Sequence, residues 1–130
     1  MNRIANIIIS GALALTVTAA EAAEDTNSAN RFMPGCRSVL AGSSKVADLT
    51  PMGLCIGIVR GIGTMAILLN LGMPEHRGAL ALICMDPPGE VTTAQEIRVV
   101  VAYIDARPAR MHEDFGALAV EALHAAWPCK

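Results

Sequence analysis

The sequence has few aromatic residues and no excess of positive charge. It contains two Phe, one Tyr and one Trp among its 130 residues, and its formal net charge is -2. The hydrophobic core must therefore be built from Ile, Leu, Val, Met and Ala side chains. Because a nucleic-acid-binding domain usually carries a basic patch, we expect no nucleic-acid partner.

Catalytic and metal-binding motifs are also missing from the sequence. No Ser occupies a G-x-S-x-G elbow, no C-x-x-C redox pair exists, and the cysteines are too widely spaced for the close ligand pairs of a zinc site. His112, Glu113 and Asp114 are consecutive, and consecutive residues fan around a helix instead of sharing a face. No nucleophile, base and orienting partner can be named together. We therefore predict a non-enzymatic protein with no catalytic residue, no metal site and no cofactor.

The first 22 residues have the pattern of a secretory signal peptide. Arg3 lies in a short n-region, residues 7–17 form an apolar h-region, and residues 20–22 fit the A-x-A cleavage pattern. This apolar run is shorter than the roughly 20 residues that a membrane-spanning helix needs. We predict cleavage, a periplasmic location and no membrane attachment of the mature chain. An uncleaved membrane anchor is the alternative.

Four cysteines follow the predicted signal peptide: Cys36, Cys55, Cys84 and Cys129. An even number of cysteines in a short exported chain is typical of a disulfide framework. Four cysteines allow three pairings, and the sequence alone does not choose between them. We favour Cys55–Cys84, which would tie the longest apolar segment to the connector that follows it. Cys36–Cys129 would then pin the two ends of the domain together.

The longest apolar segment predicts a helix over residues 51–71. Thr50 is placed to act as its N-cap and Pro51 as its first helical residue. Gly53, Gly57 and Gly61 recur every four residues and fall on one line of its surface. Each of these glycines weakens a helix by about 1 kcal/mol relative to Ala, so we expect a neighbouring backbone to pack closely on the line. A membrane-associated helix is the alternative.

The C-terminal third predicts two further helices and no strand. Thr92 with Gln95, or Thr93 with Glu96, forms a capping box, and the apolar stripe that follows at helical spacing leaves Glu96 to one side. This stripe consists of Ile97, Val100, Val101 and Ile104. Pro108 interrupts the pattern, and the next helix places on one face Met111, Phe115, Leu118 and Ala122. The predicted fold is an all-α small helical bundle stapled by two disulfides.

We divide the chain into three parts. Residues 1–22 are the signal peptide, residues 23–48 are a polar tether (23–30) followed by a short helix around Cys36, and residues 49–130 are the helical domain. Within that domain the connector, residues 73–90, mixes charged and apolar side chains. We predict that a protein partner binds this connector, with contacts from Glu75, His76 and Arg77.

Part of the sequence resembles the Rap/Tai family of bacterial immunity proteins. Cys55-Ile56-Gly57 with Gly61 is similar to the C-x-G-Y-x-x-G opening of the family, although Ile58 replaces the tyrosine and Thr64 stands where an acidic residue is common. The remaining similarity lies in Cys84, Pro87, Gly89, Val91-Thr92, Gln95, Val100, Tyr103-Ile104, Pro108, Leu118, Ala122-Leu123, Ala126 and Pro128-Cys129.

The resemblance implies a small, helical, disulfide-bonded periplasmic protein that acts by binding. Characterised relatives block peptidoglycan amidase toxins delivered by type VI secretion, often as homodimers. The expected partner is therefore a cell-wall amidase effector, and a homodimer is expected as well. Two alternatives stay open: a periplasmic acid-stress chaperone resembling the HdeA group, and a general periplasmic binding protein of unknown partner.

Overall fold

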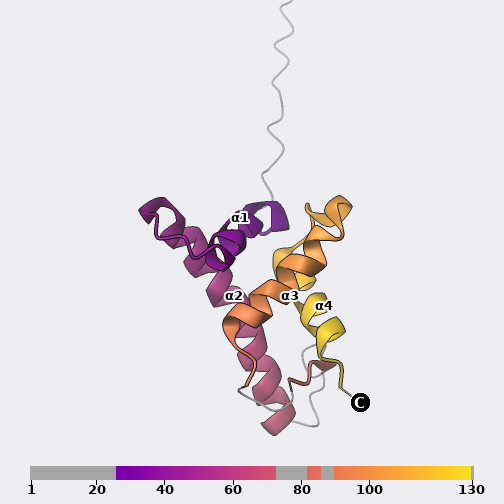
Figure 1. Ribbon diagram of the computed structural model, residues 1–130. Coiled ribbons are helices and arrows are strands. Elements are labelled where there is room, and N and C mark those ends of the chain that lie inside the picture. Colours follow the sequence, from indigo (N-terminus) through magenta and orange to yellow (C-terminus); the bar gives the residue numbers. More distant parts are fainter. Residues whose placement is uncertain (1–25, 73–81, 86–89, 130) are drawn as a thin grey trace, which may run out of the picture.

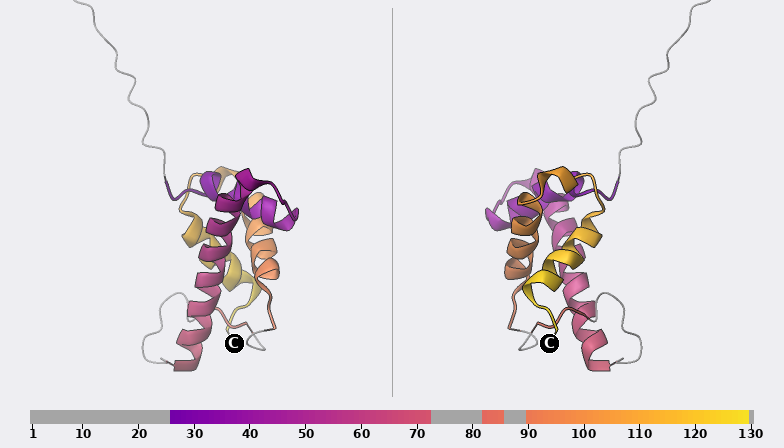
Figure 2. Two further views of the ribbon diagram at one scale, coloured as in Figure 1. Left: turned by 90° about the vertical axis from the view of Figure 1, so that its left-hand side faces the viewer. Right: turned by 90° about the vertical axis from the view of Figure 1, so that its right-hand side faces the viewer.

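The computed structural model describes residues 26–72, 82–85 and 90–129 as a helical bundle. In these ranges the only strand-like pairs are two isolated antiparallel bridges, so the predicted all-α class is confirmed. Figures 1 and 2 show α2, α3 and α4 running along the bundle, with α1 lying across the end where α2 begins. The elements are α1 (Ala29–Leu40), α2 (Val46–Gly72), α3 (Thr93–Asp105), the 3₁₀ turn η2 (Pro108–Arg110) and α4 (Phe115–Ala126).

Helix α1 packs on the start of α2 at the distance of backbone contact. Gly35 of α1 lies directly against Pro51 of α2, so that a Cβ placed on Gly35 would be 2.5 Å from the Pro51 carbonyl carbon and closer still to its oxygen. Only a residue without a Cβ fits such a contact. The neighbouring residue, Cys36, is fully buried and bonded to Cys55, one turn beyond Pro51 on α2.

Helix α2 begins earlier than the sequence pattern predicts. We expected Thr50 as the N-cap and Pro51 as the first helical residue, but the helix starts at Val46 and includes Pro51. Ahead of the proline, Asp48 lies in the first turn, where a carboxylate favours the helix dipole, and it accepts a hydrogen bond from the Ser43 hydroxyl. The extra residues lengthen the helix at the cost of the one backbone hydrogen bond that proline cannot donate.

The line of Gly53, Gly57 and Gly61 faces away from the bundle, which corrects our expectation of a backbone packed on it. All three are exposed, and a Cβ added to any of them would meet nothing within 4 Å. The bundle instead covers the opposite edge of α2, which turns inward Cys55, Val59, Gly63 and Ala66. A regular spacing of small residues therefore marked the outside of this helix.

Helix α3 starts with the predicted capping box. The Thr92 hydroxyl accepts a hydrogen bond from the Gln95 backbone amide, and the Gln95 side chain accepts one from the Thr92 amide. The predicted apolar stripe is buried, with 8% exposure at most in Ile97, Val100, Val101 and Ile104. Glu96, however, is also fully buried. Our expectation that it lies off the buried stripe was wrong.

Helix α4 completes the bundle and contributes Phe115 to a stacked pair of aromatic rings. Asp114 caps its N-terminus through a hydrogen bond from the Ala117 amide, so Met111 precedes the helix instead of starting its buried face. Phe115 stacks on Phe32 of α1 with ring centroids 5.2 Å apart.

Residues 27–30, which we expected in the polar tether, are hydrogen-bonded through their backbone to residues 111–115. The N-terminal helix is therefore built into the bundle.

By length and composition, α2 could also span a membrane. The most apolar 18-residue window of its segment Val46–Leu71 has a mean hydropathy of 1.9, and 22% of that window is buried in the fold. The central helix of a soluble protein passes the same test, so this property alone does not separate the two interpretations.

Candidate partner-binding surface

The two disulfides hold opposite ends of the bundle. Cys36 is bonded to Cys55, with Cα atoms 5.3 Å apart, and Cys84 is bonded to Cys129, with Cα atoms 4.9 Å apart. The pairing that we favoured, Cys55–Cys84 with Cys36–Cys129, was therefore wrong. The physical reason is visible in Figure 1: α1 lies at one end of the bundle and the C-terminus at the other, so Cys36 and Cys129 are far from each other.

Residues 82–85 are fastened to the C-terminal end of the chain. The Cys84 amide donates a hydrogen bond to the Trp127 carbonyl, and the Cys129 amide donates one to the Leu82 carbonyl. These bonds flank an antiparallel bridge between Ile83 and Pro128. Because Ile83 is fully buried and Met85 is 5% exposed, this short segment belongs to the core.

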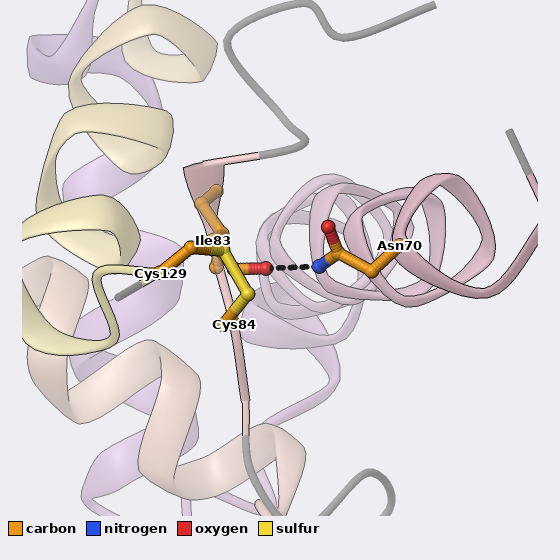
Figure 3. Close-up of a disulfide and its surroundings, with 4 residues drawn as sticks. All are labelled: Asn70, Ile83, Cys84 and Cys129. Atoms are coloured by element: carbon orange, nitrogen blue, oxygen red, sulfur yellow. Dashed lines mark hydrogen bonds between the residues drawn. A yellow bond between two sulfur atoms is a disulfide. The ribbon is translucent and has the colours of Figure 1, made fainter. Parts of the chain in front are cut away.

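The last turn of α2 is tied to the same segment. The side-chain amide of Asn70 donates a 2.6 Å hydrogen bond to the Ile83 carbonyl, next to the Cys84–Cys129 disulfide (Figure 3). This hydrogen bond joins the last turn of α2 directly to residues 82–85. The Cys84–Cys129 disulfide and the two backbone hydrogen bonds join the same residues 82–85 to the C-terminal end of the chain.

The predicted partner-binding residues, Glu75, His76 and Arg77, lie outside the described residues. Around the two ends of their segment the surface is apolar: Leu68 is 55% exposed, Leu71 is 71% exposed and Leu82 is 48% exposed. Large hydrophobic side chains left in solvent at one end of a small domain are typical of a surface that meets a partner.

A network of hydrogen-bonded charged groups holds η2 against α4, away from residues 82–85. The Arg110 guanidinium donates hydrogen bonds to both Glu113 and Glu121, and the Tyr103 hydroxyl donates a further one to Glu121. Hydrogen bonds from Arg110 are the main reason why the pKa values of Glu113 and Glu121 lie below the usual range. No group of three or more His, Cys, Asp or Glu side chains in the described ranges could hold a metal ion. We interpret the Arg110 network as structural.

The helix order, the two disulfides and the anchored segment can now be compared with known proteins. A family model of the Rap1a immunity proteins matches residues 18–129. The chain belongs to this family. No curated protein and no solved structure gave a match.

Membership of the Rap1a immunity proteins assigns a general function to the chain. It is an immunity protein, and its expected partner is a secreted toxin. Membership of an immunity-protein family points to an inhibitor and not to an enzyme. The disulfides of this Rap1a protein fit that role, because a rigid surface loses less conformational entropy when it binds.

Sequence reasoning missed the residues that make the closest contacts of the Rap1a fold. Gly35, Gly63 and Asn70 were not among the residues to which the sequence analysis gave a role. Gly63 lies against Glu96, where an added Cβ would overlap Oε1 and lie 3.1 Å from Cδ. One available signal was that Gly63 falls outside the four-residue spacing of Gly53, Gly57 and Gly61, which places it on a different face of the helix.

Proposed function

We propose that this Rap1a protein neutralises a peptidoglycan amidase toxin of type VI secretion in the periplasm. The family match carries the proposal, because it makes the chain an immunity protein against a secreted toxin. The signal-peptide pattern of residues 1–22 supports a periplasmic site of action. Cell-wall amidases act in that compartment, and the disulfides are stable in it.

The connector, residues 73–90, is the proposed toxin-binding segment. Its support is the anchoring around residues 82–85: Asn70 bonds to Ile83, and Cys84 is bonded to Cys129. A segment with fixed ends has fewer conformations to lose when it docks, so more of its contact energy appears as affinity. The exposed Leu71 and Leu82 on either side would add apolar area to such an interface.

Alanine substitution of Glu75, His76 and Arg77 together tests this assignment. If these side chains dock on the toxin, their removal should cost at least about 2 kcal/mol, or about 30-fold in Kd. Co-expression with an exported candidate amidase should then show loss of protection from lysis. Isothermal titration calorimetry with the purified amidase gives the change in Kd.

The control removes three exposed ionisable side chains elsewhere, Lys45, Arg98 and His124. This control should protect cells as well as the wild type does. Full protection by the connector variant would remove the connector from the interface. Failure of the wild-type protein to bind or protect against any peptidoglycan amidase would overturn the proposed toxin class.

We also propose that two copies associate through the exposed face of α2, which carries Leu54, Gly57, Gly61, Met65 and Leu68. These leucines and the methionine are 44–55% exposed, and Asp48 and Arg60 are the only charged residues of the helix. An isologous contact places the same patch on both partners. Gly57 and Gly61 lie on either side of residue 59, which is the middle of α2 (Val46–Gly72). Two antiparallel α2 helices that meet at residue 59 would therefore overlap along their whole length.

Changing Leu54 and Leu68 to Glu should convert the dimer to a monomer, since each dimer would then bury four carboxylates. We expect the dimer Kd to rise at least about 100-fold, measured by sedimentation velocity on the mature protein. The control is Leu82→Glu, which places one charge at an equally exposed position of another element. A wild-type protein that sediments as a monomer at every concentration would contradict the dimer. A wild-type protein that needs detergent to stay in solution would instead favour the alternative in which α2 is a membrane-associated helix.

A further inference from the structure

The α2–α3 contact contains a buried carboxyl group that the proposed function does not use. Glu96 is fully buried, and neither of its carboxyl oxygens has a hydrogen-bond partner among the described residues. The carboxyl group lies directly against the bare backbone of Gly63. The methyl carbon of Met85 approaches the same position, 3.5 Å from where a Gly63 Cβ would be. The carboxyl group is thus enclosed by the backbone of α2 and an apolar side chain.

Among the residues that the structure describes, one cation is close enough to compensate the charge of this carboxyl group. Arg60 is on α2, with Nη1 3.9 Å from Oε1 of Glu96, and half of its side chain is exposed to solvent. At that distance the two groups form an ion pair without a hydrogen bond. A buried carboxylate that lacks hydrogen bonds is strongly disfavoured relative to its protonated form.

The charged groups of the other elements that pack on α3 are engaged elsewhere or exposed. Arg37 of α1 pairs with Asp105 at the far end of α3, and Glu121 of α4 is bonded to Arg110 and Tyr103. His124 of α4 and Arg98 of α3 are exposed. Cys84, from the segment beside Met85, is in a disulfide. Within the described ranges, the ionisation of Glu96 is therefore governed by its burial and by Arg60.

We propose that Glu96, Gly63 and Arg60 form a proton-controlled joint between α2 and α3, which tightens when Glu96 takes up a proton and loosens when it loses one. The neutral carboxyl group fits the apolar contact with Gly63 and Met85. The ionised group draws Arg60 inward and favours motions that admit water between the helices. This joint does not depend on the identity of the toxin.

The direction of the pH effect follows from the burial of Glu96. Burial raises the pKa of its carboxyl group, and the nearby Arg60 lowers it by a smaller amount. The folded state then binds this proton more tightly than the unfolded state, so stability falls as pH rises from about 4.5 through the folded-state value. The Arg110 network has the opposite pH dependence. Because the pKa values of Glu113 and Glu121 are lowered in the folded state, these two groups stabilise the fold near neutral pH, and their contribution is lost as the pH falls into the acidic range.

Thermal unfolding between pH 5 and pH 8 tests the joint with two substitutions, Glu96→Gln and Glu96→Met. Both remove the titratable group, and Met also removes the need for hydrogen bonds. We expect the Tm of each variant to exceed that of the wild type by at least about 4 °C at pH 8, and the difference to narrow towards pH 5. Glu90→Gln is the control, since Glu90 is exposed just before α3, and its profile should follow the wild type.

A second measurement on the unmodified protein keeps the test decisive if a variant does not fold. The side-chain carboxyl carbon of Glu96 can be titrated by NMR in the wild-type chain, and it should change protonation above the usual range of an exposed glutamate. Two results would overturn the joint: a Tm difference that stays constant from pH 5 to pH 8, or a Glu96 carboxyl carbon that titrates at or below the ordinary value.

Discussion

Replacing Gly35 with Ala should be among the most destabilising single substitutions in this protein. The added Cβ would lie 2.5 Å from the Pro51 carbonyl carbon and would overlap the carbonyl oxygen, and both obstructing atoms belong to the backbone. No side-chain rotation can relieve the overlap, so α1 must move away from α2. We expect a loss of about 3 kcal/mol in the free energy of unfolding, at the upper end for overpacking, measured by urea denaturation of the mature protein.

The opposite sign is expected for the same substitution at Gly53. That residue is also in a helix, but a Cβ there would meet nothing within 4 Å. Gly53→Ala should therefore stabilise the protein by up to about 1 kcal/mol, the difference in helix propensity between the two residues. If Gly35→Ala were as stable as the wild type, α1 would not pack on α2 through this contact.

Features set by neighbouring residues could be predicted from the sequence. The Thr92–Gln95 capping box and the buried stripe of α3 depend on spacings of three and four residues within one helix, and both are present. The same local signals failed at the start of α2. Proline is common at the first position of a helix, so Pro51 predicted the wrong start. The helix begins at Val46 instead, because Asp48 and Ser43 stabilise an earlier start.

Features that join distant segments could not be predicted in this way. The cysteine pairing depends on α1 lying across the start of α2, and nothing in the spacing of Cys36 and Cys55 encodes that placement. The burial of Glu96 likewise depends on the gap that Gly63 leaves in α2. A glutamate beside an apolar stripe is usually solvated, so its position became clear only from the packing of the two helices.

The connector as the contact segment stays a prediction, because Glu75, His76 and Arg77 lie outside the described residues. The sequence also indicated Cys84 as an anchor of the connector, but its partner is Cys129 and not the predicted Cys55. It did not indicate Asn70, because an Asn followed closely by Gly at the end of a helix is sufficiently explained as a stop signal. The hydrogen bond from Asn70 to Ile83 spans 13 residues of chain, and such a bond is invisible to helical periodicity.

Removing the Cys84–Cys129 disulfide should have the largest effect on stability. Its cysteines are 45 residues apart, against 19 for Cys36–Cys55, and the entropy that a cross-link removes from the unfolded chain grows with the length of the closed loop. On this basis the double substitution Cys84→Ser/Cys129→Ser should cost about 4 kcal/mol, and Cys36→Ser/Cys55→Ser about 3 kcal/mol. Urea denaturation of both variants under identical conditions measures the two losses.

Trp127, the one tryptophan of the chain, reports which end of the bundle has been loosened. Its carbonyl accepts the hydrogen bond from the Cys84 amide, so this half-buried residue is joined to the segment that the second disulfide holds. In the folded state the Cys84/Cys129 variant should show red-shifted Trp127 emission and weaker toxin binding, because the anchor of the connector is lost. The Cys36/Cys55 variant should keep the wild-type emission, since its cross-link lies at the α1 end. Equal shifts in the two variants would show that the disulfides do not act on separate ends of the fold.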